Sequence, residues 1–205
     1  MIIKLYEENP NPKDLKKVVE ILKNDGVIIY PTDSVYAFGC NIFSSKALDR
    51  IAKIKKLDPQ KAHFSLIFYD LSQISNYTNP LNNETFKLLK RNLPGPFTFI
   101  LEANSNVPKM LKMNKKKTIG IRIPNNNIAR QIVYELGNPI FTTSVIEHDD
   151  IIEYITDPEL IHEKYNEQVD LVIDGGYGTL TPSTIVDCTH EKAEIIREGA
   201  GELLV

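Results

Sequence analysis

Two arginines lie inside strongly apolar segments, where a charged side chain needs a partner. Arg122 follows Ile119 and Ile121, and Arg197 follows a pair of isoleucines. An unpaired guanidinium is costly to bury, so each arginine is expected either to face solvent or to meet an anion. The planar guanidinium binds carboxylates and phosphates through two hydrogen bonds. Both positions are therefore candidates for an anion-binding site.

Several hydroxyl side chains also lie at the ends of apolar segments. They are Thr32, Thr118, Ser144, Ser183 and Thr184. Each alone is more typical of a turn or a strand edge than of a ligand site. Thr32 follows the apolar run 26–30, however, and open α/β sheets bind ligands at the carboxyl ends of their strands. Together with the two arginines, these hydroxyls could line a polar cavity for a zwitterion and a polyphosphate.

A run of three lysines, Lys115, Lys116 and Lys117, comes just before the segment that contains Arg122. Charge runs usually serve solubility, so a solvated loop is the ordinary interpretation. The alternative is a surface that binds the phosphates of RNA, with an affinity that falls steeply as salt is added.

The motifs of several other chemistries do not occur in this sequence. The segment 175–178 is rich in glycine, but a strand beginning with proline follows it, where a phosphate-binding loop needs a helix. The four histidines lack the spacing of metal ligands, and no order of serine, histidine and aspartate stands out. Electrostatic positioning of reactants is therefore expected, rather than covalent catalysis or a metal held by the protein.

The sequence predicts helices and strands that alternate along the chain. Asn11 and Pro12 predict a helix start, and an apolar face with helical spacing follows at Leu15, Val18, Val19 and Leu22. Further helices are expected from Ser44 or Ser45, from Asn83 with Phe86, Leu89 and Leu93 inward, and over residues 127–136. Strands are expected at residues 26–30, 63–69, 97–101, 118–123, 139–145, 169–173, 183–188 and 194–197. Alternation of this kind indicates an α/β fold.

Composition is consistent with one domain spanning residues 1–205. The chain is 42% hydrophobic and 25% charged, with a net charge of −3. That charge argues against a generally cationic nucleic-acid coat, but it leaves room for a local basic patch. No apolar run approaches the roughly 20 residues that span a bilayer, so no membrane association is expected. Two cysteines and a start unlike a signal peptide favour the cytoplasm.

Five motifs in a fixed order suggest a family. They are PTDSVYAFGC, PGPFTFIL, TIGIRIP, TTSV and PSTIVDCT…IIREGAG, and they span residues 31–201. In this order they resemble the YrdC/YciO family of threonylcarbamoyl-AMP synthases and related nucleic-acid-binding proteins, most closely its YciO branch. The resemblance implies a twisted mixed sheet with flanking helices and a polar, basic cavity at the strand ends.

The resemblance also implies a reaction and its partners. L-threonine and bicarbonate would form N-carboxy-threonine, whose carboxylate attacks the α-phosphorus of ATP and releases pyrophosphate. The product, threonylcarbamoyl-AMP, serves tRNA modification, and Mg²⁺ would accompany the ATP. The class implied is a nucleotidyltransferase, and on the residues retained an enzyme is favoured over a binding protein.

Seven side chains would surround the reactants by the same resemblance. Those around L-threonine are Thr32, Arg122, Ser144 and Ser183. Those facing the nucleotide are Lys55, Thr118 and Arg197. Lys55, Arg122 and Ser144 are the residues expected to carry catalysis.

Two departures from the family pattern bear on activity. The Lys-x-Arg element of the competent members ends here in Leu57, and the Ser-x-Asn element ends in Ile146. Loss of one electrostatic donor can cost on the order of 10²-fold in rate. A weak synthase, an enzyme with a changed substrate, or a protein that only binds is therefore expected. The alternative from another class is a non-catalytic protein that binds double-stranded RNA or tRNA through a basic concave face including residues 115–117.

Overall fold

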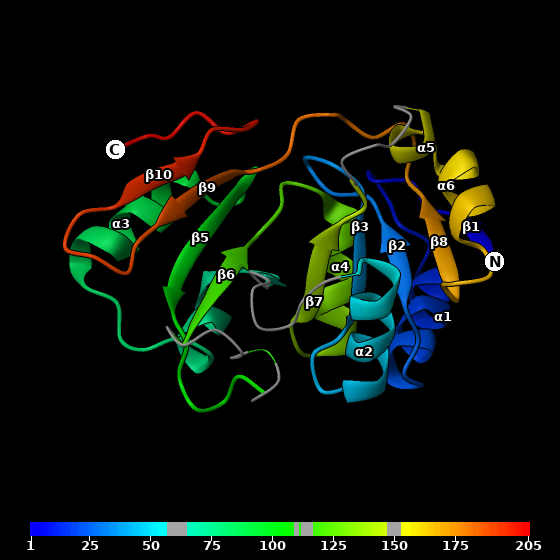
Figure 1. Cartoon of the computed structure of the whole chain (residues 1–205), viewed down its shortest axis with the longest axis horizontal. Helices are drawn as coiled ribbons and strands as arrows, with labels where there is room; N and C mark the ends of the chain where they lie inside the picture. The colour runs from blue at the N-terminus through cyan, green and yellow to red at the C-terminus, as the bar shows by residue number, and fades with distance from the viewer. Residues whose placement is uncertain (57–64, 109–110, 112–116, 147–152) are drawn as a thin grey trace.

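The protein is built on one mixed β-sheet (Figure 1). The structure is a computed structural model that describes residues 1–56, 65–108, 111, 117–146 and 153–205. Ten strands form the sheet within these ranges, in the order β1-β8-β2-β3-β7-β4-β6-β5-β9-β10. They are β1 (Ile2–Lys4), β2 (Ile28–Tyr30), β3 (Ala37–Asn41), β4 (Ser65–Ile67), β5 (Phe97–Glu102), β6 (Thr118–Arg122), β7 (Ile140–Ser144), β8 (Leu171–Asp174), β9 (Thr184–Asp187) and β10 (Glu194–Arg197). The predicted α/β class with a mixed sheet is confirmed.

Helices flank both faces of the sheet. They are α1 (Pro12–Lys23), α2 (Ser45–Ile54), α3 (Asn83–Asn92), α4 (Asn127–Leu136), α5 (Glu153–Thr156) and α6 (Pro158–Tyr165), with the 3₁₀-helix η1 at Leu71–Asn76. One buried cluster joins α1 and α4 to β1, β2 and β8. A larger cluster joins α2, α3 and α6 to the central strands. The N-terminus lies near β1 at one end of the molecule, and the C-terminus lies near β10 at the other (Figure 1).

The first helix begins and packs as its sequence predicts. The Asn11 side chain accepts a hydrogen bond from the Lys13 amide at 2.9 Å, and Pro12 occupies the first turn. Helix α4 likewise ends as expected, because Gly137 adopts the left-handed conformation with φ 81° that glycine tolerates.

The predicted face of α3 is partly wrong. Asn82, rather than Asn83, caps this helix by accepting from the Thr85 amide at 2.7 Å. Leu88 and Leu89 point inward, whereas Phe86 is 47% exposed.

Strand β3 was not predicted, because residues 31–40 resemble a polar turn after the apolar run that precedes them. The turn is shorter than that segment, and the chain then returns antiparallel to β2 and pairs with β7 on its other side. Gly39 lies at the centre of β3 and closely approaches a neighbouring ring. A Cβ atom at Gly39 would lie 2.7 Å from Cε1 of Tyr30.

Candidate functional site

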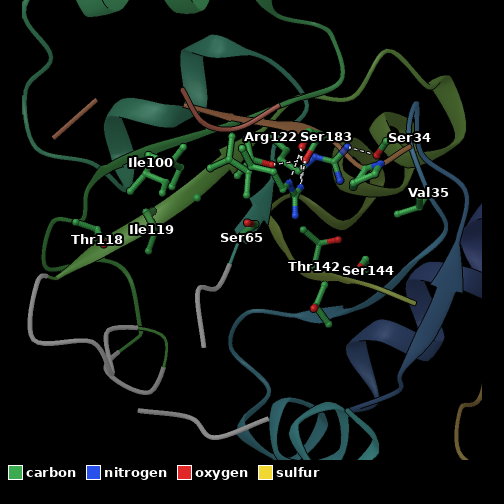
Figure 2. A pocket seen from close by; sticks show the side chains of 17 residues that line it. Ser34, Val35, Ser65, Ile100, Thr118, Ile119, Arg122, Thr142, Ser144 and Ser183 are labelled. Carbon is green, nitrogen blue, oxygen red and sulfur yellow. Dashed lines mark hydrogen bonds between the residues drawn. The ribbon is translucent and has the colours of Figure 1, made fainter. Parts of the chain in front are cut away.

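A polar cavity of about 280 Å³ lies where β4, β5, β6 and β7 meet the start of β9 and the end of β10 (Figure 2). Among the described lining residues, most polar groups are hydroxyls and the two charged residues are both arginines. The polar side chains are Ser34, Ser65, Thr98, Thr118, Arg122, Thr142, Thr143, Ser144, Ser183 and Arg197. Such a lining favours an anionic ligand over a cationic one.

The register of the sheet brings these residues together. Ile100 of β5 is level with Gly120 of β6, which is level with Ser65 of β4, and Ser65 is level with Thr142 of β7. Since side chains alternate between the two faces of a sheet, residues two positions before or after these four in their strands lie on the same face as the cavity. A Cβ atom at Gly120 would lie 2.4 Å from Oγ of Ser65. The lack of a side chain at Gly120 therefore keeps the floor of the cavity open.

Arg122 is buried at the cavity wall and is held by the turn after β2. Its Nη2 donates to Oδ1 of Asp33 at 3.0 Å and to Oγ of Ser34 at 2.9 Å. The other carboxylate oxygen of Asp33 accepts from the amide of Asn125 at 2.6 Å. The buried Nε of Arg122 has no hydrogen-bond partner within the described ranges. One N–H of this cavity-lining arginine therefore has no partner in the described structure.

Of the two expected outcomes for Arg122, solvent exposure or an anionic partner, the structure shows the second, and the partner is Asp33. The ion pair is almost fully buried, with the side chains 7% and 8% exposed. Burial raises the pKa of Asp33, and the charge of Arg122 and the Asn125 amide counter only part of that rise. Because this carboxylate already binds Arg122 and a backbone amide, it serves to hold the guanidinium in place.

Arg197 approaches the cavity from β10. Its Nε and Nη2 donate to the carbonyl oxygen of Ser183 at 3.2 and 2.7 Å. The Ser183 hydroxyl lies 2.8 Å from the hydroxyl of Thr98. Partial burial and, after it, the positive charge of Arg122 lower the pKa of Arg197. Two guanidiniums thus repel each other across one cavity, and an anion between them would relieve that repulsion.

The structure brings most of the predicted site residues to this cavity. Thr118, Arg122, Ser144, Ser183 and Arg197 all line it. Their individual roles in binding or catalysis remain predictions.

Two predicted site residues are not among its described lining residues. The hydroxyl of Thr32 donates to the carbonyl of Val35 at 2.8 Å and accepts from the amide of Ser34 at 3.1 Å. Thr32 therefore shapes the turn that presents Ser34. Lys55 follows α2, and its Nζ donates to the carbonyl of Ile146 at 2.7 Å.

Thr184, another candidate hydroxyl, has a structural role. Its Oγ1 donates to the carbonyl of Gly201 at 2.6 Å and accepts from the amides of Gly199 and Gly201, both at 3.0 Å. These bonds hold the last residues of the chain against β9. With Thr184 only 1% exposed, its hydroxyl is fully committed to this segment.

Sequence reasoning missed several lining hydroxyls, namely those of Ser65, Thr98 and Thr142. The signal that could have found them is alternation. Thr98 lies between Phe97 and Phe99, which are buried in the core. A hydroxyl at alternate positions of an otherwise apolar strand marks the face that is not covered by a helix.

The predicted RNA surface lies mostly outside the described residues. Lys115 and Lys116 lie outside the described residues. Leu57, of the Lys-x-Arg element, also lies outside them. Lys117 is described, and it is exposed just before β6. The RNA-binding surface therefore stays a prediction.

No group of three or more histidine, cysteine, aspartate or glutamate side chains within the described ranges is placed to hold a metal. Asp33, which lies beside the cavity, is already paired with Arg122. Mg²⁺ is usually bound through one or two carboxylates together with substrate phosphates. The expectation of Mg²⁺ therefore concerns the nucleotide, whose phosphates would carry the ion.

Two further observations concern the rest of the molecule. A second pocket, of about 530 Å³, lies beside η1 and α3, and its described lining residues are apolar, hydroxyl and amide side chains without a charged group. It does not suit an anion.

None of the helices in the described ranges is long and apolar enough to cross a membrane.

Comparison with known proteins identifies the family of the chain and agrees with its fold. The model of the Sua5/YciO/YrdC family, described as telomere recombination, matches residues 20–199. The YciO protein of Escherichia coli is 40% identical over 200 residues, which cover 97% of this chain and 95% of that protein. The crystal structure of E. coli YciO superimposes with a TM-score of 0.91 at 38% identity, covering 98% of this chain and 97% of that one.

Two relatives carry names or ligands that bear on chemistry. A protein of Methanocaldococcus jannaschii named putative threonylcarbamoyl-AMP synthase is 34% identical over 203 residues, covering 97% of this chain and 92% of that protein. The structure of P. abyssi Sua5 complexed with L-threonine matches in fold, with a TM-score of 0.85 at 23% identity. It is matched over 97% of this chain and 57% of that one.

Proposed function

The chain belongs to the Sua5/YciO/YrdC family, and on that premise we propose that it binds L-threonine and ATP in the cavity between Arg122 and Arg197. We propose further that it forms threonylcarbamoyl-AMP with an efficiency lower than that of members with a complete Lys-x-Arg element. The observation that carries the proposal is the presence of two guanidiniums in one cavity lined by hydroxyls.

Each reactant presents negative charge that this cavity can neutralise. L-threonine carries a carboxylate, and the unpartnered Nε–H of Arg122 is a donor of the kind that carboxylates bind. ATP carries a triphosphate, and Arg197 is placed across the cavity with its guanidinium partly buried. Threonine binding in P. abyssi Sua5, which has the same fold, supports the amino-acid half of the proposal.

The proposed reaction needs positioning more than it needs a protein nucleophile. The carboxylate oxygen of N-carboxy-threonine forms a bond to the α-phosphorus of ATP, and the bond from that phosphorus to the bridging oxygen of the β-phosphate breaks. Pyrophosphate leaves with the electron pair. Negative charge on the phosphoryl oxygens is neutralised by the arginines, and the reactants are held in line by the hydroxyls.

The size and composition of the site support the lower efficiency. At about 280 Å³, the cavity lies just below the ~300–1,000 Å³ range of ligand pockets, which is small for a nucleotide together with an amino acid. Ile146 supplies only a backbone carbonyl here, which accepts from Lys55 at 2.7 Å. An asparagine at this position would add a polar amide.

The proposal is tested by incubating the protein with ATP, L-threonine and bicarbonate. Pyrophosphate release is followed, and threonylcarbamoyl-AMP is identified by mass spectrometry. We expect release that depends on threonine and falls about 10²-fold in Arg197→Gln. A matched control is Arg50→Gln, which removes an arginine paired with Asp170 at 2.8 Å and away from the cavity. Absence of the product, or equal release without threonine, would contradict the proposal.

A further inference from the structure

Thr142 contributes a hydroxyl to the cavity that is oriented from behind by a buried tyrosine. The phenol of Tyr30 donates to Oγ1 of Thr142 at 2.7 Å, although the two residues are 112 positions apart in the sequence. Tyr30 is fully buried and Thr142 is 3% exposed. The hydrogen bond is therefore shielded from solvent, where such bonds are strongest.

The contact between Tyr30 and Thr142 crosses the strand that lies between them. Strand β3 lies between β2, which carries Tyr30, and β7, which carries Thr142. Gly39 of β3 is level with Thr142, and the Tyr30 ring lies so close to Gly39 that a Cβ atom there would be 2.7 Å from Cε1. The absence of a side chain at Gly39 thus lets the phenol cross β3 and reach the cavity residue.

Counting protons shows what Thr142 offers to a ligand. A threonine hydroxyl has one proton and two acceptor lone pairs. Thr142 accepts the phenolic proton of Tyr30, and its side chain makes no other hydrogen bond to the described residues. Since Thr142 lines the cavity (Figure 2), that proton is available to a ligand there.

Tyr30 keeps the direction of this bond constant. Burial raises the pKa of the Tyr30 phenol far above its ordinary value. The phenol therefore stays protonated and remains a donor over the whole pH range in which the protein would be studied.

A second uncommitted donor lies in the same cavity. The Nε of Arg122 is buried and has no partner in the described structure, and Arg122 is 6% exposed. The open groups of Thr142 and Arg122 are thus both donors, one neutral and one charged. An oxygen atom that carries negative charge and accepts several hydrogen bonds satisfies both.

We infer that Thr142 binds an oxyanion in this cavity and helps to determine its specificity, and that Tyr30 is a positioning residue that holds the Thr142 hydroxyl as a donor. The inference rests on the proposed function for the source of the oxyanion, which would be the carboxylate of L-threonine or a phosphate of the nucleotide. Both groups present the same negatively charged oxygen acceptors.

The two sources are separated by titrating L-threonine and inorganic pyrophosphate individually, with calorimetric detection. The proteins compared are the wild type, Tyr30→Phe, Thr142→Val, the double variant and Thr142→Ser. We expect Thr142→Val to weaken one of the two probes by about tenfold or more, the value of a hydrogen bond to a charged group. Thr142→Ser retains the hydroxyl and should restore most of the affinity.

The positioning role of Tyr30 is tested by the coupling between the two sites. Tyr30→Phe should weaken the same probe by about threefold, as the loss of a neutral hydrogen bond predicts, and should have no further effect once Thr142 is valine. The matched control is Tyr36→Phe. This change removes another buried phenol, which donates to the carbonyl of Gly176 at 2.7 Å and does not line the cavity, so affinity should be unchanged.

Several results would overturn the inference. They are failure of the wild type to bind either probe, equal affinities in the wild type and Thr142→Val, and an undiminished Tyr30→Phe effect in the valine background. If Thr142→Val does not fold, a Thr142→Ser variant weakened as much as Tyr30→Phe would count against the hydroxyl, and one that matches the wild type would support it. Coupled losses in binding without product formation would refute the synthase proposal and leave this inference standing.

Discussion

Replacing Arg122 with glutamine should destabilise the protein through the carboxylate that it leaves behind. Arg122 and Asp33 form an ion pair at 3.0 Å, with the side chains 7% and 8% exposed. In Arg122→Gln the Asp33 carboxylate remains buried and retains the hydrogen bond from the Asn125 amide at 2.6 Å. The substitution therefore leaves a buried charge without its counter-ion, which lowers the free energy of unfolding.

The magnitude follows from the burial of the pair. Removing one partner of a buried ion pair costs about 3–5 kcal/mol. For a chain of this length each kcal/mol lowers Tm by about 2–4 °C, so a decrease of roughly 6–20 °C is expected. Adding Asp33→Asn to Arg122→Gln removes both charges and should recover most of the loss, because neutral partners of similar shape carry no such desolvation cost.

The cost should also depend on pH. Burial raises the pKa of Asp33 and Arg122 opposes this rise, so the pKa should rise further in Arg122→Gln. An acid whose pKa is higher in the folded state stabilises the fold below its unfolded pKa of about 3.9 and loses that contribution as pH rises through the folded pKa. Arg122→Gln should therefore be least destabilised near pH 4 and most destabilised at neutral pH.

Urea unfolding at a series of pH values measures all three effects. The proteins required are the wild type, both single variants and the double variant. A loss below about 1 kcal/mol in Arg122→Gln at neutral pH, typical of an exposed pair, would refute the reasoning. So would a double variant no more stable than Arg122→Gln.

Three further predictions concern other parts of the chain. Restoring the family pattern with Leu57→Arg and Ile146→Asn should strengthen ATP binding and raise pyrophosphate release, and a rate no higher than the parent's would show that these positions do not limit it. Replacing Lys115–Lys117 with glutamine should flatten the salt dependence of duplex-RNA binding without affecting folding, and an unchanged slope in filter-binding assays would place the RNA surface elsewhere. Thr184→Val should lower the free energy of unfolding by about 2–4 kcal/mol, because the amides of Gly199 and Gly201 would lose their acceptor, and a loss below about 1 kcal/mol would contradict that account.

Much of the fold follows from local signals. In α1, a capping asparagine, a proline at the start and apolar residues at helical spacing all point to the same helix, and α4 spans residues 127–136 as predicted. Strand β3 lacks such a signal, because its alanine and glycine are small and the turn before it is polar. It is a strand because β2 and β7 pair with it from both sides, and pairing over long distances leaves little trace in a short segment.

The same distinction applies to the candidate site. Arg122 could be found from its sequence because a charge in an apolar strand is conspicuous. Its partner Asp33 lies 89 positions away, and the Tyr30–Thr142 contact joins residues 112 positions apart. These contacts depend on which strands are neighbours in the sheet, which local sequence does not specify. Thr32, chosen from its place after an apolar run as well as by resemblance, and Lys55, chosen by resemblance, are bonded to backbone carbonyls, and their roles stay predictions.

The most direct test of the central proposal is a crystal structure of the protein with L-threonine and a non-hydrolysable ATP analogue, both at saturating concentration. We predict density for the threonine carboxylate within hydrogen-bonding distance of Arg122 Nε, and for phosphate groups beside Arg197. The hydroxyl of Thr142 should donate to one of these anions. A cavity without either ligand under these conditions, or ligands bound elsewhere on the molecule, would contradict the proposed function.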